Sequence, residues 1–158
     1  MITRGRTASR IICSDPLAHE YLRFQDRWLS RAHRDGRVEI DSNPIEEIPF
    51  LPDSFDTVVL INVLDHVRDV ALCLDNALKL LRPNGWLVLG QDLAKPETVG
   101  DPRYEWFEQG HPHRVVMTNL EPYLSRLDRR YQRIGPPRDP RLQTSVLAWA
   151  GVKRGDRG

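Results

Sequence analysis

Histidine residues stand at two points of the sequence where a side chain could take part in acid–base chemistry. His66 comes shortly after the apolar run 55–61, and His111 and His113 flank a proline in a long connection. Imidazole titrates near neutral pH, so His66 could act as a general base toward a hydroxyl substrate, or could order its loop by hydrogen bonding. His111 and His113 could contact a substrate, bind a metal ion or lie on a surface loop. Because no Asp, Glu or Cys cluster accompanies them, the sequence predicts no metal site.

Short apolar runs predict the strands that would position such side chains. These runs are residues 10–14, 38–40, 55–61 and 86–89. The third is almost continuously apolar, which is typical of a strand covered on both faces. Strands that alternate with amphipathic helices indicate an α/β fold with a mainly parallel sheet. Ligands in such folds bind beyond the carboxyl ends of the strands.

Helical spacing of apolar residues predicts the elements between and after these strands. One helix is expected from Pro16 to His33, and a second after Asp69, which can cap it. The last third predicts a short helix over 119–127 and an antiparallel strand pair, 131–134 with 145–152, at one sheet edge. The expected apolar stripe of the first helix consists of Leu17, Tyr21, Phe24 and Trp28.

Composition restricts the functional class. The 158 residues are 40% hydrophobic, enough for one core, and 23 Lys and Arg against 22 Asp and Glu give no strong nucleic-acid signal. No apolar run approaches the roughly 20 residues that cross a bilayer, and no secretory signal is visible. Cys13 and Cys73 lack metal-site spacing and fit a reducing compartment. We expect a cytoplasmic domain over residues 1–152 with no membrane partner, followed by a polar tail, 153–158.

Four short motifs, in this order, carry a family resemblance. They are Ile-Glu-Glu-Ile-Pro-Phe (45–50), Asp-Ser-Phe-Asp (53–56), Asn-Val-Leu-Asp-His-Val (62–67) and Leu-Leu-Arg-Pro-Asn-Gly (80–85). Together they resemble the class I, Rossmann-like S-adenosylmethionine-dependent methyltransferases of the methyltransferase type 11 kind. The resemblance reaches from Ser14-Asp15-Pro16 to about Leu89 and thins afterwards. It implies a Rossmann-like α/β sheet and S-adenosyl-L-methionine as cofactor, with S-adenosyl-L-homocysteine as product.

The resemblance implies an adenosine site after the first two predicted strands. Asp15, followed by Pro16, would accept hydrogen bonds from the ribose diol; alternatively, Asp15 only caps the helix that follows. Asn43, Pro44 and Ile45 would line the adenine pocket; alternatively, they form an ordinary turn.

The same resemblance implies a cofactor cleft and an acceptor site after the later strands. Asn62 and Val63 would lie beside the cleft. Loops beyond the strand 86–89 hold the acceptor in the family, and His111 lies in such a loop. His111 and His66, which follows the strand 55–61, are the candidate catalytic residues.

The family's Gly-rich turn, acidic-x-Gly-x-Gly-x-Gly after its first strand, is not in this sequence. Its glycines let the backbone approach the methionine end of the cofactor. The first predicted strand here, 10–14, ends in Asp15 and matches the family's second strand. We therefore expect a truncated sheet without the first βα unit. Two strand edges would then be open, and a second copy or a partner chain could complete the sheet.

The sequence thus predicts an S-adenosylmethionine-dependent methyltransferase acting on an unidentified small-molecule acceptor. The alternative is a non-catalytic, degenerate or truncated methyltransferase-like domain that serves as an interaction module or requires a partner chain. The absent Gly-rich turn favours the alternative, whereas the order of the four motifs favours the enzyme. A nicotinamide-dependent Rossmann enzyme fits less well, because it also needs a Gly-rich turn.

Overall fold

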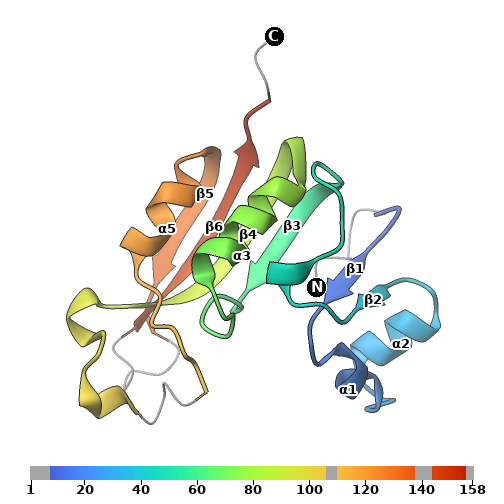
Figure 1. Ribbon diagram of the computed structural model, residues 1–158, viewed down its shortest axis with the longest axis horizontal. Coiled ribbons are helices and arrows are strands. Elements are labelled where there is room, and N and C mark those ends of the chain that lie inside the picture. The colour runs from blue at the N-terminus through green and yellow to red at the C-terminus, as the bar shows by residue number, and fades with distance from the viewer. Residues whose placement is uncertain (1–7, 106–109, 138–143, 156–158) are drawn as a thin grey trace. The chain divides into compact units, whose positions relative to one another are not determined.

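The computed structural model describes residues 8–105, 110–137 and 144–155. The chain forms two compact units, Met1–Pro49 and Phe50–Gly158. Each unit contains its own β-sheet (Figure 1).

The first unit is a small parallel sheet with two short helices. β1 (Ile12–Ser14) pairs in parallel with β2 (Glu39–Asp41). The chain between them forms α1 (Ala18–Leu22) and α2 (Trp28–Arg34), since two parallel strands need a crossover connection. A turn of 3-10 helix, Ile45–Glu47, follows β2. Both predicted strands of this unit are confirmed.

The single helix predicted from Pro16 to His33 is wrong, because the chain leaves the helical path after Leu22. The buried Ser30 hydroxyl donates to the carbonyl oxygens of Tyr21 and Phe24, at 3.2 and 2.9 Å, so these carbonyls are satisfied outside a continuous helix. The predicted apolar stripe is exposed rather than buried: Leu17 is 55% exposed, Tyr21 40%, Phe24 62% and Trp28 53%.

The second unit is a mixed sheet of four strands in the order β3-β4-β6-β5. The strands are β3 (Phe55–Ile61), β4 (Leu81–Ala94), β5 (Leu127–Gly135) and β6 (Thr144–Lys153). β3 and β4 are parallel, whereas β6 is antiparallel to both of its neighbours. The predicted antiparallel pair at one edge is confirmed, and β4 extends well beyond the predicted 86–89.

Two helices, α3 (Val70–Leu80) and α5 (Met117–Leu124), lie over one face of this sheet (Figure 1). The Asp69 side chain accepts a hydrogen bond from the Leu72 N–H at 3.0 Å, so the predicted cap of α3 is confirmed. α5 starts and ends earlier than the predicted 119–127, since Leu127 already belongs to β5. The helices and strands share a buried core that includes Leu74, Leu78, Leu87, Leu89, Leu120, Leu124, Leu147 and Trp149.

Within the described residues, β1 and β3 each lie at the edge of a sheet. Among the described residues, β1 pairs with β2 alone and β3 with β4 alone. The α/β architecture, with parallel strands and an antiparallel C-terminal pair, agrees with the expected fold class. Every helix in the described ranges is too short or too polar to cross a membrane.

Candidate functional site

The carboxyl ends of β1 and β2 are joined by polar contacts to Asp41. The Asp15 N–H donates to the Asp41 carbonyl at 3.0 Å. The Ser14 hydroxyl and the Asn43 amide donate to the two oxygens of the Asp41 carboxylate, at 2.7 and 2.6 Å. Two segments predicted to contact a cofactor thus lie side by side. Asp41 was not predicted from the sequence. The one feature that could have indicated it is its position as an acid at the end of a strand.

One oxygen of the Asp15 carboxylate stabilises the turn that leads into α1. Its Oδ1 accepts a hydrogen bond from the Leu17 N–H at 2.7 Å, which forms a local turn across Pro16. The second oxygen takes no part in this contact, so the turn is compatible with ligand binding by Asp15. On the neighbouring segment, Pro44 precedes the 3-10 turn that begins at Ile45.

We expect Cys13 to react slowly with alkylating reagents. Burial raises the pKa of its thiol, and the nearby charge of Asp15 raises that pKa further. Because the thiolate is the reactive form, Asp15→Asn should increase the rate of alkylation by iodoacetamide a few-fold in mildly alkaline buffer. The matched control Asp35→Asn removes an exposed acid of the same unit and should leave the rate unchanged. Equal rates in the wild type and Asp15→Asn would contradict the electrostatic coupling.

Asn62 leaves the carboxyl end of β3 in a left-handed conformation, with φ of 54°. Asparagine tolerates this region better than most residues, and the Asn62 N–H donates to the Gly90 carbonyl at 2.8 Å. The side-chain oxygen of Asn62 is buried and has no hydrogen-bond partner among the described residues. A buried acceptor of this kind is costly unless a ligand or water donates to it. Val63 follows, partly buried.

Two histidines that the sequence singled out lie close to a buried acid: His66 and Asp65 in the loop after β3, and His111 in the connection after β4. The ring centroids of His66 and His111 lie 4.6 Å apart. Their Nε2 atoms lie 3.8 and 3.9 Å from Asp65 Oδ2. The Asp65 side chain is only 7% exposed, against 49% for His66 and 31% for His111. Sequence reasoning missed Asp65, because an acid in a loop is expected to face solvent.

Gln91 of β4 fixes the position of the Asp65 carboxylate. Gln91 is fully buried; its Nε2 donates to Asp65 Oδ1 at 3.1 Å and its Oε1 accepts from the Leu64 N–H at 3.2 Å. Both ends of the amide are therefore used, and Oδ2 of Asp65 is left facing the two imidazoles. The sequence signal is a polar residue on the buried, alternating face of β4, in line with Leu87, Leu89 and Leu93.

Backbone hydrogen bonds bring the connection after β4 to this loop. The Ala94 N–H donates to the Val115 carbonyl at 2.8 Å, which closes the base of the connection. The His113 N–H donates to the Asp65 carbonyl at 3.4 Å. These contacts place His111 beside His66, although the two residues lie far apart in the sequence.

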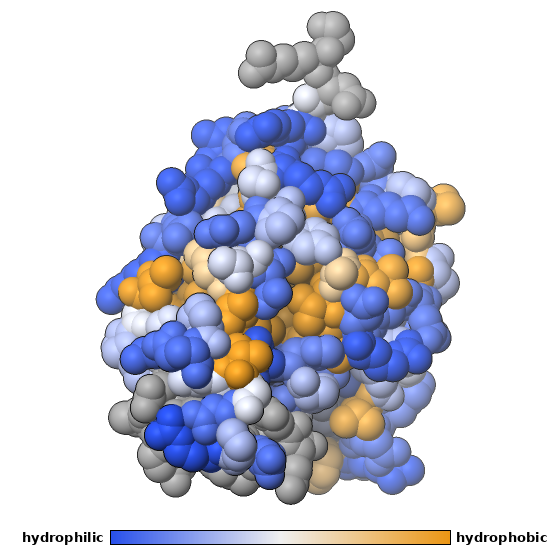
Figure 2. All heavy atoms as spheres, turned by 60° about the vertical axis from the view of Figure 1, so that its left-hand side comes forward, coloured by the Kyte–Doolittle hydropathy of each residue, from blue (hydrophilic) through white to orange (hydrophobic). Residues whose placement is uncertain are grey.

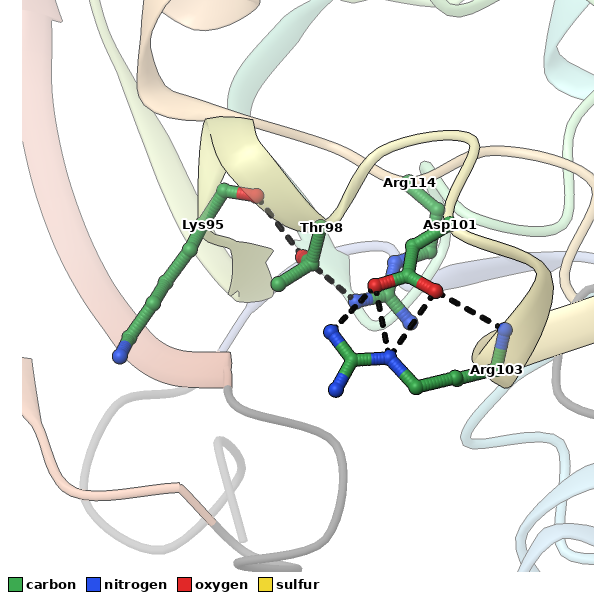
Figure 3. Close-up of polar contacts among 5 residues, drawn as sticks. All are labelled: Lys95, Thr98, Asp101, Arg103 and Arg114. Carbon is green, nitrogen blue, oxygen red and sulfur yellow. Dashed lines mark hydrogen bonds and ion pairs between the residues drawn. The ribbon is translucent and has the colours of Figure 1, made fainter.

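A polar cluster stabilises the same connection from within (Figure 3). Arg114 donates to the Thr98 hydroxyl at 3.1 Å, and that hydroxyl donates to the Lys95 carbonyl at 2.8 Å. The side-chain hydrogen bond from Arg103 holds the pKa of the Asp101 carboxyl below its ordinary value. The contact therefore favours the folded connection at neutral pH and is lost as the pH falls through that lowered pKa.

The surface on the side of α5 and β5 is amphipathic. Figure 2 brings forward the side of Figure 1 that carries α5 and β5, and shows hydrophobic side chains interrupted by hydrophilic ones. Partly exposed imidazoles beside a buried carboxylate can accept a proton from a bound molecule, and the carboxylate can stabilise the resulting imidazolium.

Comparison with known proteins gives a family match for the first half of the chain. A model of the methyltransferase domain matches residues 6–89, more than half of the chain. A hybrid PKS-NRPS synthetase from Talaromyces variabilis is 30% identical over 96 residues, which are 58% of this chain and 2% of that protein. The chain spans about 2% of the length of the curated relatives it matches.

Two solved structures share the fold. The YcgJ protein of Bacillus subtilis superposes with a TM-score of 0.67 and 15% identity, covering 98% of this chain and 96% of that one. The N-methyltransferase NodS of Bradyrhizobium japonicum, solved with S-adenosyl-L-homocysteine, gives a TM-score of 0.64 and 18% identity, covering 92% and 67%. These likenesses confirm the α/β class predicted from the sequence.

Proposed function

The chain belongs to the methyltransferase domain family, and on this basis we propose that it transfers the methyl group of S-adenosylmethionine to a small-molecule acceptor. The family match over residues 6–89 carries the proposal. S-adenosyl-L-homocysteine in the NodS structure supports the choice of cofactor. The relative named as a PKS-NRPS synthetase supports a small molecule as acceptor.

The residues of the chain fit such a cofactor. Asp15 has a carboxylate oxygen outside its turn that can accept from a ribose hydroxyl, and Asn43 to Ile45 can line the base. The side-chain oxygen of Asn62 is buried without a partner in the part of the chain that the structure describes, so it can accept a hydrogen bond from the cofactor, with Val63 beside it.

In this reaction the protein mainly aligns the cofactor with the acceptor and removes one proton from the acceptor. When bound, the cofactor supplies an electrophilic methyl group on a sulfonium. The acceptor oxygen attacks that carbon as the carbon–sulfur bond breaks, and S-adenosylhomocysteine leaves. His66 or His111 takes the proton of the acceptor hydroxyl, and Asp65 stabilises the imidazolium. Holding the two reactants in line supplies most of the remaining rate enhancement.

Formation of S-adenosylhomocysteine tests this function. We expect mass spectrometry to detect it when the purified chain is incubated with S-adenosylmethionine and a panel of small phenols and alcohols. His66→Ala should lower the acceptor-dependent rate by about 100-fold to 10,000-fold, because general-base catalysis contributes that much.

A matched control is His19→Ala, which removes an exposed imidazole of α1 and should keep the wild-type rate. S-adenosylhomocysteine that forms equally with and without acceptor, or equally in His66→Ala, would argue against the proposed roles.

A further inference from the structure

The side chains that meet in the loop after β3 also form a set of metal ligands. Asp65, His66 and His111 each offer one ligand atom, and the three atoms lie within 4.8 Å of one another. We propose that these three residues bind a divalent transition-metal ion of the zinc type, through Asp65 Oδ2 and the two Nε2 atoms. The sequence predicted no metal site, because the acid that completes the set was not expected beside the histidines.

The chemistry of the donors favours such an ion. Two imidazoles and a carboxylate suit zinc and its first-row neighbours, whereas magnesium and calcium prefer oxygen ligands alone. Sites with three protein ligands commonly keep a position open for water or substrate. The imidazoles of His66, which is exposed, and His111, which is partly exposed, leave room for that position.

The distances are close to those of a loaded site. An ion at about 2.0–2.2 Å from each ligand needs ligand atoms about 3.3–3.5 Å apart. The two oxygen–nitrogen distances are 3.8 and 3.9 Å. A contraction of about half an ångström would bring these pairs to ligand spacing. His66 can supply much of the movement, because half of its side chain is exposed.

An independent observation supports Asp65 as a ligand. Metal-binding carboxylates are normally held by a hydrogen bond from a second residue. Gln91 Nε2 provides one to Oδ1 at 3.1 Å, and so directs Oδ2 toward the imidazoles. A carboxylate buried to this degree also favours a nearby positive charge, which the ion would supply.

The catalytic consequence rests on the proposed function, whereas metal binding itself does not. With the ion bound, His66 and His111 would serve as ligands rather than as bases, and the ion would lower the pKa of an acceptor hydroxyl at the open position, which would release its proton to water. The metal-free chain would use the imidazole route.

Titration of the full chain with zinc, and separately with cobalt(II), tests the site in the absence of cofactor. We expect calorimetry to give one zinc ion per chain, and cobalt(II) to give visible absorption bands from imidazole and carboxylate ligation. His66→Ala and His111→Ala should each raise the zinc Kd by at least about 100-fold, because the loss of even a supporting residue costs 10- to 100-fold. Both side chains are partly exposed, so circular dichroism should show wild-type folding.

The matched control His19→Ala should bind zinc like the wild type. No zinc heat and no cobalt absorption in a folded chain would overturn the site, as would an unchanged Kd in the His66→Ala, His111→Ala double variant. A parallel titration with S-adenosylhomocysteine separates the two proposals. Binding of S-adenosylhomocysteine without binding of zinc rejects the metal site alone. Binding of zinc without binding of S-adenosylhomocysteine rejects the proposed cofactor alone.

Discussion

Replacing Gln91 with leucine should lower the free energy of unfolding by about 2–6 kcal/mol. The two residues are similar in size, so no large cavity forms. The Leu64 N–H and Asp65 Oδ1 lose their buried partner, and each unsatisfied group costs about 1–3 kcal/mol. Urea denaturation followed by circular dichroism measures the change. An unchanged m-value would show that the substitution alters the free energy of unfolding and not the compactness of either state.

Gln132→Leu is the matched control for this substitution. Gln132 lies exposed on β5, where its side chain accepts a hydrogen bond from Arg129. Its replacement should change the stability by less than about 0.5 kcal/mol, as surface substitutions usually do. If Gln91→Leu were as mild as Gln132→Leu, the buried amide would not be holding Asp65 as described.

Asp15→Ala should weaken binding of S-adenosylhomocysteine by about 100-fold or more. A carboxylate that accepts from a ribose hydroxyl forms a charge-assisted hydrogen bond worth about 1.5–3 kcal/mol, and a ribose diol offers two. Calorimetric titration measures the Kd of the wild type and the variant under the same conditions.

Two further variants separate ribose binding from the local turn. Asp15→Asn keeps an oxygen that can accept from the Leu17 N–H, so any loss of affinity in this variant reports the missing charge. Asp35→Ala removes an exposed acid that pairs with Arg37 in the same unit, and should leave the Kd unchanged. A wild-type Kd in Asp15→Ala would show that Asp15 serves the turn alone.

The elements predicted well are those whose signal is local. The apolar run of β3 was predicted to the residue, Phe55–Ile61, and Asp69 marks the start of α3 because its cap involves only the next turn. The length of β4 was not predictable in this way. Its last residue, Ala94, pairs with Thr144, so its extent depends on a strand far along the chain.

The helix predicted from Pro16 to His33 failed for a related reason. Helical spacing in the sequence was real, but Ser30 folds back onto the carbonyls of Tyr21 and Phe24 and divides the segment. A side chain that competes for backbone groups is not visible in a hydrophobic pattern.

The candidate site was predicted in parts but not as an arrangement. His66 and His111 stand out by residue type, yet their proximity depends on the bond between Ala94 and Val115 at the base of the connection. Asp65 and Gln91 are polar residues whose importance comes from burial, which only the tertiary structure reveals.

Titration of the purified wild-type chain with S-adenosylmethionine and S-adenosylhomocysteine tests the proposed methyl transfer at its first step, because cofactor binding must precede methyl transfer. We expect saturable binding of one molecule per chain, with a micromolar Kd, and a ligand-dependent rise in Tm. A folded chain that gives neither heat nor a shift in Tm with either compound would contradict methyltransferase activity of this chain.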